Sequence, residues 1–182
     1  CVIEEGTMVD DRIPVGVLGA TGTVGRKLVE LLTGHPWFRL AEVCGSSSSS
    51  GEILARGWNS AGGESASAAP ESLRLKDPDS PWESPILFSA LPASAAREQE
   101  IRLVECGHIL VSNASVHRMR PDVPLIIPEI NSHHLEIVAH QAWEGSLITN
   151  PNCAVSALAL ALAPLHEVFG VKQVVTTSFQ AI

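Results

Sequence analysis

The stretch RIPVGVLGATGTVGRKLVELLTGHP, from Arg12 to Pro36, decides the fold of this chain. Its apolar beginning at Val15, Val17 and Leu18 predicts a buried strand, and apolar residues at helical spacing between Val24 and Leu32 predict an amphipathic helix. Four glycines lie at the junction of these two elements, from Gly16 to Gly25. A strand that passes through a short turn into a helix is the first half of a parallel βαβ unit.

The rest of the chain repeats this alternation of strands and helices. We expect strands at FRLAEVCG, weakly near Leu73 to Leu75, at PILFSALP, HILVSNAS, VPLIIPEIN and GSLITN, and finally at KQVVTTSF. We expect helices at ASAAREQEIRLVECG, at HHLEIVAHQAW with Asn131 or Ser132 as the cap, and from Cys153 to about Val168. This order predicts an α/β protein with a mostly parallel sheet covered on both faces.

Composition excludes several classes of function. The formal net charge of −8 argues against nucleic acid as a partner, because binding to phosphate backbones calls for basic patches. No apolar run reaches the length of a membrane span. The acidic first residues lack the basic region of a signal peptide. His133, His134 and His140 do not follow a standard ligand spacing, so we expect no metal site.

The four cysteines show neither paired nor metal-type spacing. Together with the missing signal peptide, this predicts a reducing compartment such as the cytoplasm, without disulfides. Cys44 and Cys106 lie inside apolar patterns and are expected in the core. Cys153 stands apart, because it follows Asn150-Pro151-Asn152 at the start of a long apolar helix.

The glycine turn predicts a dinucleotide site. Gly16, Gly19, Gly22 and Gly25 form the pattern G-x-x-G-x-x-G at a strand-to-helix junction. Glycine there lets the main chain approach a pyrophosphate, and the helix N-terminus supplies amide donors. The alternative is a tight turn without a ligand.

The end of the second expected strand bears on which dinucleotide is bound. An acidic residue there accepts a hydrogen bond from the ribose 2′-hydroxyl of NAD. This chain instead continues Cys44-Gly45-Ser46 with a run of serines, which favours NADP. The alternative is that Ser46 to Ser50 is only a flexible linker.

Cys153 is expected to be a nucleophile. Unpaired amides and the helix dipole favour a thiolate at the first turn of a helix. The side-chain amide of Asn152 could hold an oxyanion or a substrate phosphate, and Pro151 stiffens the approach. Such junctions also lie at the edge of α/β sheets where ligands bind. The alternative is a buried cysteine that only fills space.

Six motifs in order make the chain resemble a known family. GVLGATGTVG, FSALP, SNASVHRM, DVPLIIPEIN, NPNCAVSALALALAPLHEVFG and TTSFQAI together resemble aspartate-semialdehyde dehydrogenase, most closely its archaeal and fungal branch. The resemblance implies a Rossmann-type, doubly wound cofactor domain over residues 10–150, and at 151–182 the start of an α+β catalytic and dimerisation domain. It also implies NADPH-dependent reduction of β-aspartyl phosphate to aspartate β-semialdehyde, with release of phosphate, in lysine, threonine and methionine biosynthesis.

The resemblance also assigns roles to residues. Cys153 would form a thioacyl intermediate, Gln180 would orient the acyl group, and Arg118 with Asn152 would bind phosphate. The implied cofactor contacts are Gly16, Gly19, Thr21, Gly22, Thr23 and Val24 at the pyrophosphate, Ser46, Ser47 and Ser49 at the 2′-phosphate, and Ser89, Ala90, Leu91, Pro92 and Asn113 near the nicotinamide. Relatives commonly place an arginine where this chain has Ser48 and a basic residue where it has Glu52.

Relatives continue past the position of Ile182 into a domain with a histidine acid/base and a carboxylate-binding arginine. We therefore expect this chain alone to bind cofactor at most, and the full protein to form a homodimer or homotetramer. Malonyl-CoA reductase and N-acetyl-glutamyl-phosphate reductase are alternatives with the same thiol chemistry, although the latter usually reads NPGCY at its cysteine. A non-catalytic nucleotide-binding fragment is an alternative of a different class.

Overall fold

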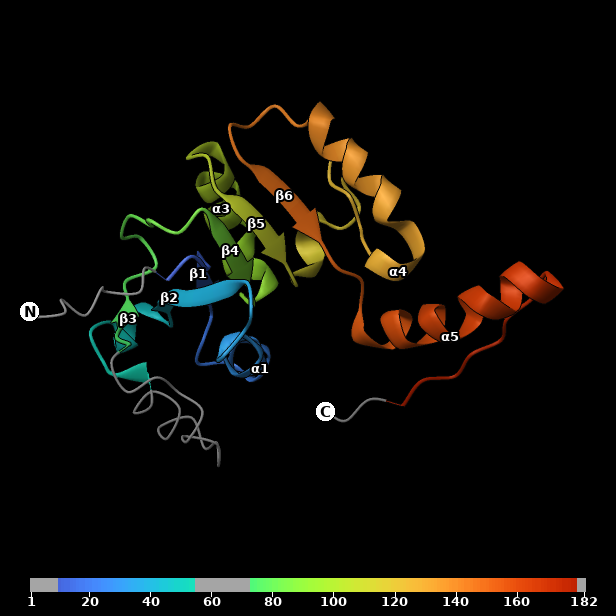
Figure 1. The fold of residues 1–182 in the computed structure, drawn as a ribbon, viewed down its shortest axis with the longest axis horizontal. Coiled ribbons are helices and arrows are strands. Elements are labelled where there is room, and N and C mark those ends of the chain that lie inside the picture. The colour runs from blue at the N-terminus through green and yellow to red at the C-terminus, as the bar shows by residue number, and fades with distance from the viewer. Residues whose placement is uncertain (1–9, 55–72, 180–182) are drawn as a thin grey trace, which may run out of the picture. The chain divides into compact units, whose positions relative to one another are not determined.

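The computed structural model describes residues 10–54 and 73–179, and the chain separates into two compact units, Cys1–Pro85 and Ile86–Ile182. Each unit has its own set of parallel strands, which Figure 1 shows as arrows. Within the described residues, the ladders that join named strands inside each unit are all parallel, which confirms the expected α/β class. None of the described helices is long and apolar enough to cross a membrane.

The first unit contains the sequence that decides the fold. Its strands lie in the order β3-β2-β1, with helix α1 connecting the two longer strands. The buried face of α1 consists of Gly25, Val29 and Leu32, as the helical spacing predicts. The elements are β1 (Ile13–Leu18), α1 (Thr23–Leu32), β2 (Phe38–Cys44), the 3-10 turn η1 (Ser47–Ser49) and β3 (Leu75–Lys76).

A carboxylate fastens the segment after β3 to the first unit. Glu42 in β2 accepts hydrogen bonds from the ammonium group of Lys76, the hydroxyl of Ser84, and the backbone N–H groups of Glu83 and Ser84. Burial by itself would raise the pKa of Glu42, but the Lys76 and Ser84 hydrogen bonds outweigh it, so the pKa lies below its ordinary value. The segment from Asp77 to Ser84 is thereby tied to the middle strand.

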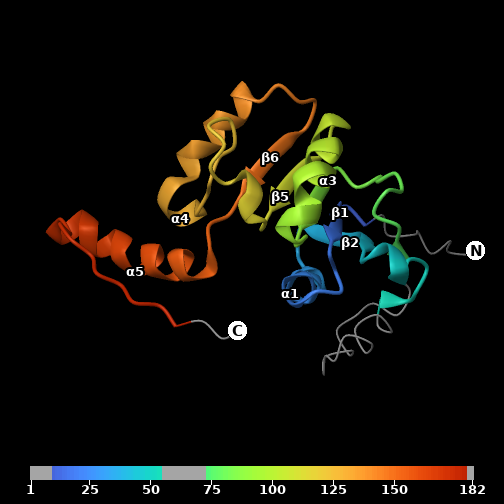
Figure 2. The ribbon, with the colours of Figure 1, turned by 180° about the vertical axis from the view of Figure 1, so that it is seen from behind.

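The second unit begins with a βαβ arrangement of the same kind. Strands β4 (Ile86–Ser89), β5 (Ile109–Ser112) and β6 (Ser146–Thr149) lie side by side in that order. Helix α3 (Ala93–Glu105) packs against them, as the view from behind shows (Figure 2). Its buried face is Ala96, Glu100, Leu103 and Val104. Cys106 follows this helix and is exposed, so its expected place in the core is wrong.

The connection between β5 and β6 differs from expectation. VPLIIPEIN does not form a strand, because only Leu125 forms a β-bridge, to Thr149. The prolines at 124 and 128 have no N–H group to donate, which prevents a continuous ladder. The chain instead forms η3 (Ser115–His117), α4 (Pro128–Asn131) and the 3-10 helix η4 (Ser132–His140).

Asn131 is the N-cap residue of η4, as expected, but its side chain makes no capping hydrogen bond. The carbonyl oxygen of the Asn131 side chain accepts from the backbone N–H of Ile127 at 2.8 Å, and its amide donates to the backbone oxygen of Leu125 at 2.9 Å. The side chain therefore closes the turn that precedes it and does not cap the helix that follows.

Gln141 protects the outer side of β6. Its side-chain amide donates to the backbone oxygen of Leu147 at 2.7 Å, and its side-chain oxygen accepts from the backbone N–H of Leu147 at 2.9 Å. The same amide donates to the backbone oxygen of Asp122. One side chain thus supplies the pair of hydrogen bonds that a neighbouring strand would make, at the end of the strand order.

Helix α5 (Cys153–Phe169) ends the regular structure of the second unit. It continues through Pro164 and ends at Gly170, whose φ of 68° lies in the left-handed region that favours glycine. No residue of α5 is buried, although the helix is strongly apolar. The strand expected at KQVVTTSF, residues 172–179, does not form. No described strand pairs with this segment.

Candidate active site

The glycine turn after β1 has the geometry of an anion site. Gly19 has a φ of 73°, and Gly22 is the N-cap of α1 without any side-chain cap. The first turn of α1 contains no acidic residue. The helix N-terminus therefore presents main-chain amides and positive potential to a ligand, which fits a pyrophosphate. The structure brings Gly19, Thr21, Gly22, Thr23 and Val24 together at this turn, whereas Gly16 is buried within β1.

Gly25 lets α1 approach the turn closely. A Cβ atom at this position would lie 2.7 Å from the carbonyl carbon of Gly19 and 2.8 Å from the Cα atom of Ala20. Side chains almost never approach backbone atoms so closely, so only glycine allows this packing.

The serine segment folds back toward the glycine turn. The hydroxyl of Ser46 lies 2.9 Å from that of Ser48 and 3.2 Å from that of Ser49, and the Ser49 hydroxyl donates to the backbone oxygen of Ser46. Gly45 separates the two loops, since a Cβ atom there would lie 2.7 Å from the Ser49 hydroxyl and 3.1 Å from the Thr21 methyl group. The loops that follow β1 and β2 are therefore neighbours, and hydroxyl groups of Ser46 to Ser48 are exposed.

In the second unit, Asn113 links the segments that follow all three strands. Its backbone N–H donates to the backbone oxygen of Ser89 at 2.9 Å, and its backbone oxygen accepts from the guanidinium of Arg118 at 2.8 Å. Its side-chain oxygen accepts from the amide of Asn150 at 3.1 Å. These hydrogen bonds link Ser89, Asn113, Arg118 and Asn150 at the carboxyl ends of β4, β5 and β6.

Arg118 is half-buried and lies beside Asn113. One terminal nitrogen bonds the backbone of Asn113, and the buried Nε atom makes no hydrogen bond with the described residues. A guanidinium is suited to bidentate binding of a phosphate or carboxylate, but the buried Nε of Arg118 is not accessible to a ligand.

Cys153 is an exposed free thiol at the first position of α5. Asn152 is the N-cap, and its side-chain oxygen accepts from the backbone N–H of Ala154 at 2.9 Å and lies 4.0 Å from the sulfur of Cys153. Ser156 donates to the backbone oxygen of Asn152 and so bonds locally within the helix. Cys153 thus lies in the first turn of a helix, where main-chain amides other than the capped one of Ala154 have no intrahelical partner.

The other described cysteines differ from Cys153. Cys44 is buried at the end of β2, as expected, and burial raises the pKa of its thiol. Cys106 is exposed at the C-terminal end of α3. Cys153 is thus the described thiol that is both accessible and placed at a helix N-terminus.

The sequence did not reveal a buried polar cluster at the carboxyl ends of β4 and β5. Glu100 of α3 is 0% exposed and lies against Ser89, Ser112 and His117. A signal was present, because Ala96, Glu100, Leu103 and Val104 share one face at helical spacing and place a glutamate among core positions. Ser89 is also 1% exposed, so its hydroxyl contacts Glu100 and not the solvent.

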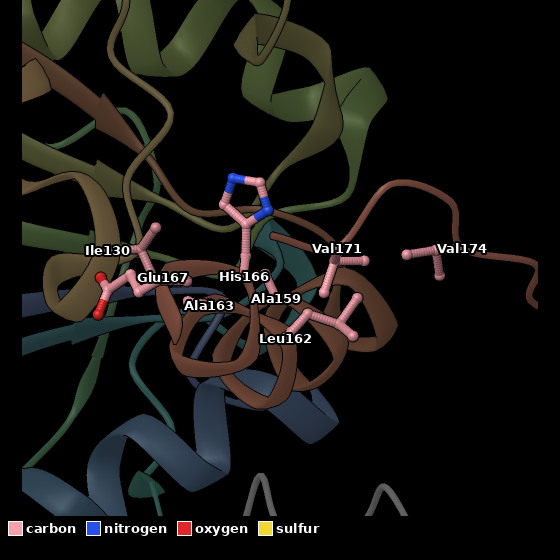
Figure 3. Close-up of a pocket in the computed structure, with 8 residues that line it drawn as sticks. All are labelled: Ile130, Ala159, Leu162, Ala163, His166, Glu167, Val171 and Val174. Carbon is pink, nitrogen blue, oxygen red and sulfur yellow. The ribbon is translucent and has the colours of Figure 1, made fainter. Parts of the chain in front are cut away.

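One apolar pocket lies away from these groups. It has a volume of about 410 Å³ and is formed between α4, α5 and the segment after α5, with Ile130, Leu162 and Val174 among its lining (Figure 3). Cys153 does not line it, and its polar groups are those of His166 and Glu167. Gln180, the remaining expected site residue, lies outside the described residues.

Residues 14–138 match the family model described as "Semialdehyde dehydrogenase, NAD binding domain". The chain belongs to the semialdehyde dehydrogenase family. The match covers the glycine turn, the serine segment, the Glu100 cluster and Arg118. Membership of this family agrees with the resemblance that the sequence motifs indicated.

Three named proteins are similar to this chain over most of its length. An aspartate-semialdehyde dehydrogenase of Methanothermobacter thermautotrophicus is 40% identical over 93% of this chain and 50% of its own length. A malonyl CoA reductase (NADP) of Metallosphaera sedula is 32% identical over 93% of this chain and 49% of its own. The crystal structure of aspartate semialdehyde dehydrogenase with NADP from Candida albicans has a TM-score of 0.77 at 31% identity, over 88% of this chain and 48% of its own. The chain therefore spans about half the length of the relatives it matches.

Proposed function

We propose that this chain is the cofactor-binding and cysteine-bearing part of an NADPH-dependent aspartate-semialdehyde dehydrogenase. The observation that carries the proposal is the exposed thiol of Cys153 at the start of α5, behind an Asn152 cap, in a chain of this family. The likeness to an aspartate-semialdehyde dehydrogenase at 40% identity supports this substrate over others.

The cofactor is assigned from the two loops of the first unit. The uncapped start of α1, with Gly19, Gly22 and the residues between and after them, suits a pyrophosphate. The exposed hydroxyls of Ser46 and Ser47, together with Ser49, suit the 2′-phosphate that distinguishes NADP from NAD. When bound, the cofactor supplies the hydride for the reduction.

Cys153 performs the covalent step. Its thiolate attacks the acyl carbon of β-aspartyl phosphate, the carbon–oxygen bond to phosphate breaks, and a thioester forms as inorganic phosphate leaves with the bonding electrons. The Asn152 oxygen is engaged as a cap, which leaves its NH₂ group to donate to the substrate. Arg118, whose guanidinium can hold an anion through two N–H groups, binds the departing phosphate. Gln180 orients the acyl group.

The nicotinamide is bordered by Ala90, Leu91, Pro92 and Asn113. Residues 151–182 begin the second domain. The whole protein assembles as a homodimer or homotetramer in the cytoplasm. Sedimentation of the full-length protein checks the assembly.

Malonyl-CoA reduction is the second candidate. It is favoured by the NADP-dependent malonyl CoA reductase among the relatives, and it uses the same thiol to form the same kind of thioester. The leaving group is then a thiol and not phosphate. The role of Arg118 in binding the departing phosphate therefore applies to β-aspartyl phosphate and not to malonyl-CoA.

The test is acylation of Cys153 followed by mass spectrometry. The full-length protein is incubated with β-aspartyl phosphate or with malonyl-CoA, and intact mass and released phosphate are measured. We expect one aspartyl group per chain on the wild type and on Cys106→Ala, which removes the other described exposed thiol, and none on Cys153→Ala. Acylation of Cys153→Ala, or malonyl transfer with no aspartyl transfer, would overturn the proposed activity.

NADPH binding is tested separately by fluorescence titration. We expect the wild-type chain to bind NADPH more tightly than NADH, through the serine hydroxyls after β2. Equal or tighter binding of NADH would contradict the assignment of these serines to the 2′-phosphate.

A further inference from the structure

The buried carboxyl of Glu100 connects the ends of two strands. Its Oε1 atom accepts from the hydroxyl of Ser89, the last residue of β4, at 2.6 Å. The same atom accepts from the hydroxyl of Ser112, the last residue of β5, at 2.8 Å. All three residues are at most 1% exposed. One oxygen of one helix residue therefore fixes both serine side chains.

Each serine in turn holds the loop that follows it. The Ser112 oxygen accepts from the backbone N–H of Ala114 at 3.0 Å, and the Ser89 oxygen accepts from the backbone N–H of Leu91 at 3.4 Å. A hydroxyl that donates to Glu100 has its lone pairs free for these amides. Two chains of hydrogen bonds thus run from the loops after β4 and β5 to the same buried carboxyl.

The arrangement does more than fill the core. Burying a carboxyl costs free energy that a leucine of similar size on the same helix face would not. The second oxygen, Oε2, makes no hydrogen bond with the described residues and lies 3.5 Å from Nε2 of His117. Nε2 of His117 also lies 3.4 Å from the backbone oxygen of Ala96. The structural contribution of the carboxyl is therefore concentrated in Oε1 and its two serines.

Burial shifts both ionisable groups toward their neutral forms. It raises the pKa of Glu100 and lowers the pKa of His117. A carboxyl oxygen accepts two hydrogen bonds whether or not the group carries a proton. Glutamine offers the same oxygen acceptor, whereas leucine offers none.

From this geometry we infer that Glu100 is a positioning residue, which through Ser89 and Ser112 holds the loops Ser89 to Pro92 and Ser112 to Ala114 in place for the nicotinamide half of the cofactor. The inference rests on the proposed function, because it assigns these loops to that end of NADPH. The pyrophosphate and 2′-phosphate contacts are assigned to loops of the first unit, whereas the hydrogen bonds of Glu100 go to Ser89 and Ser112 of the second.

The test compares two ligands that share the adenosine end. NADPH and 2′,5′-ADP, which has no nicotinamide, are titrated against the wild-type chain, Glu100→Gln, Glu100→Leu and the control Glu98→Leu, which alters an exposed residue of the same helix. We expect Glu100→Leu to weaken NADPH binding about tenfold, equivalent to ~1.4 kcal/mol, and to change 2′,5′-ADP binding less than twofold. Glu100→Gln and Glu98→Leu should match the wild type within about twofold for both ligands.

The outcomes separate positioning from stability. Equal losses for both ligands in Glu100→Leu, or no loss for either, would overturn the inference, as would a Glu100→Gln variant as impaired as Glu100→Leu. If Glu100→Leu does not fold, Ser112→Ala takes its place, and an unchanged ratio of the two dissociation constants in that variant overturns the inference. A wild-type chain that binds 2′,5′-ADP and not NADPH refutes it too, whereas one that binds neither ligand refutes the proposed function itself.

Discussion

Replacing Gly25 by alanine tests how closely α1 packs onto the glycine turn. The added Cβ atom would overlap the backbone oxygen of Gly19 and lie within 2.8 Å of two further backbone atoms. Backbone atoms cannot rotate away as a side chain can, so the helix start itself must move. Overpacking of this kind costs about 1–3 kcal/mol, and direct overlap with the main chain places Gly25 at the upper end, ~3 kcal/mol.

Helix propensity offsets part of that cost. Alanine is favoured over glycine inside a helix by ~1 kcal/mol, which leaves a net loss of about 2 kcal/mol for Gly25→Ala. For a chain of this size the corresponding fall in melting temperature is roughly 4–8 °C. Urea unfolding followed by circular dichroism measures the free energy of unfolding, and a thermal scan measures the melting temperature.

Gly22→Ala is the matched control. A Cβ atom at Gly22 would find its nearest neighbour, the backbone oxygen of Gly19, at an ordinary 3.5 Å, and the φ of −77° suits alanine. Alanine is a poorer N-cap than glycine, so the expected loss is about 0.5–1 kcal/mol. A Gly25→Ala variant as stable as Gly22→Ala would refute the argument that close approach of α1 requires glycine at position 25.

Three further predictions concern hydrogen bonds described above. Glu42→Ala removes the carboxylate that accepts from Lys76, Glu83 and Ser84, and should lower the free energy of unfolding by about 2 kcal/mol in urea titrations at pH 7. Because the folded-state pKa of Glu42 lies below its ordinary 4.5, the stability that it contributes is complete above about pH 4.5 and is lost as pH falls through the folded pKa. The wild type should therefore lose its advantage over Glu42→Ala in acid, and a constant difference between pH 7 and pH 3 would contradict this. Gln141→Leu removes both hydrogen bonds to Leu147 and should cost about 1–2 kcal/mol, measured as a shift in the urea midpoint, whereas no shift would show that water replaces them. Asn131→Ala opens the turn from Leu125 and should cost about 1–2 kcal/mol in the same assay, while His134→Ala, its exposed neighbour, should have almost no effect.

The first βαβ unit could be predicted because its signals are local. Buried valines before the turn, glycines within it and helical spacing after it all favour one structure. Cys153 could be placed for the same reason, since the strand, the Asn-Pro-Asn turn and the apolar helix follow one another directly.

Features that depend on distant partners were not predictable. VPLIIPEIN is apolar enough for a strand, but whether it pairs depends on prolines and on the position of β6. Cys106 follows an apolar run, yet the end of α3 turns it outward. The convergence of Ser89 and Ser112 on Glu100 is set by the register of β4 with β5, which places these serines side by side.

The backbone N–H of Asn113 donates a hydrogen bond to the backbone oxygen of Ser89, and the exchange of this one proton reports on the local structure. It is the first main-chain bond beyond the paired residues Ser89 and Ser112, so it breaks when the loop after β5 separates from β4, even if the strands stay paired. Its hydrogen–deuterium exchange rate therefore reports local opening of this edge, while the amides within the strand ladder report larger unfolding events. A single resolved resonance in an NMR spectrum would follow the order of this loop, with no label attached and no substitution made.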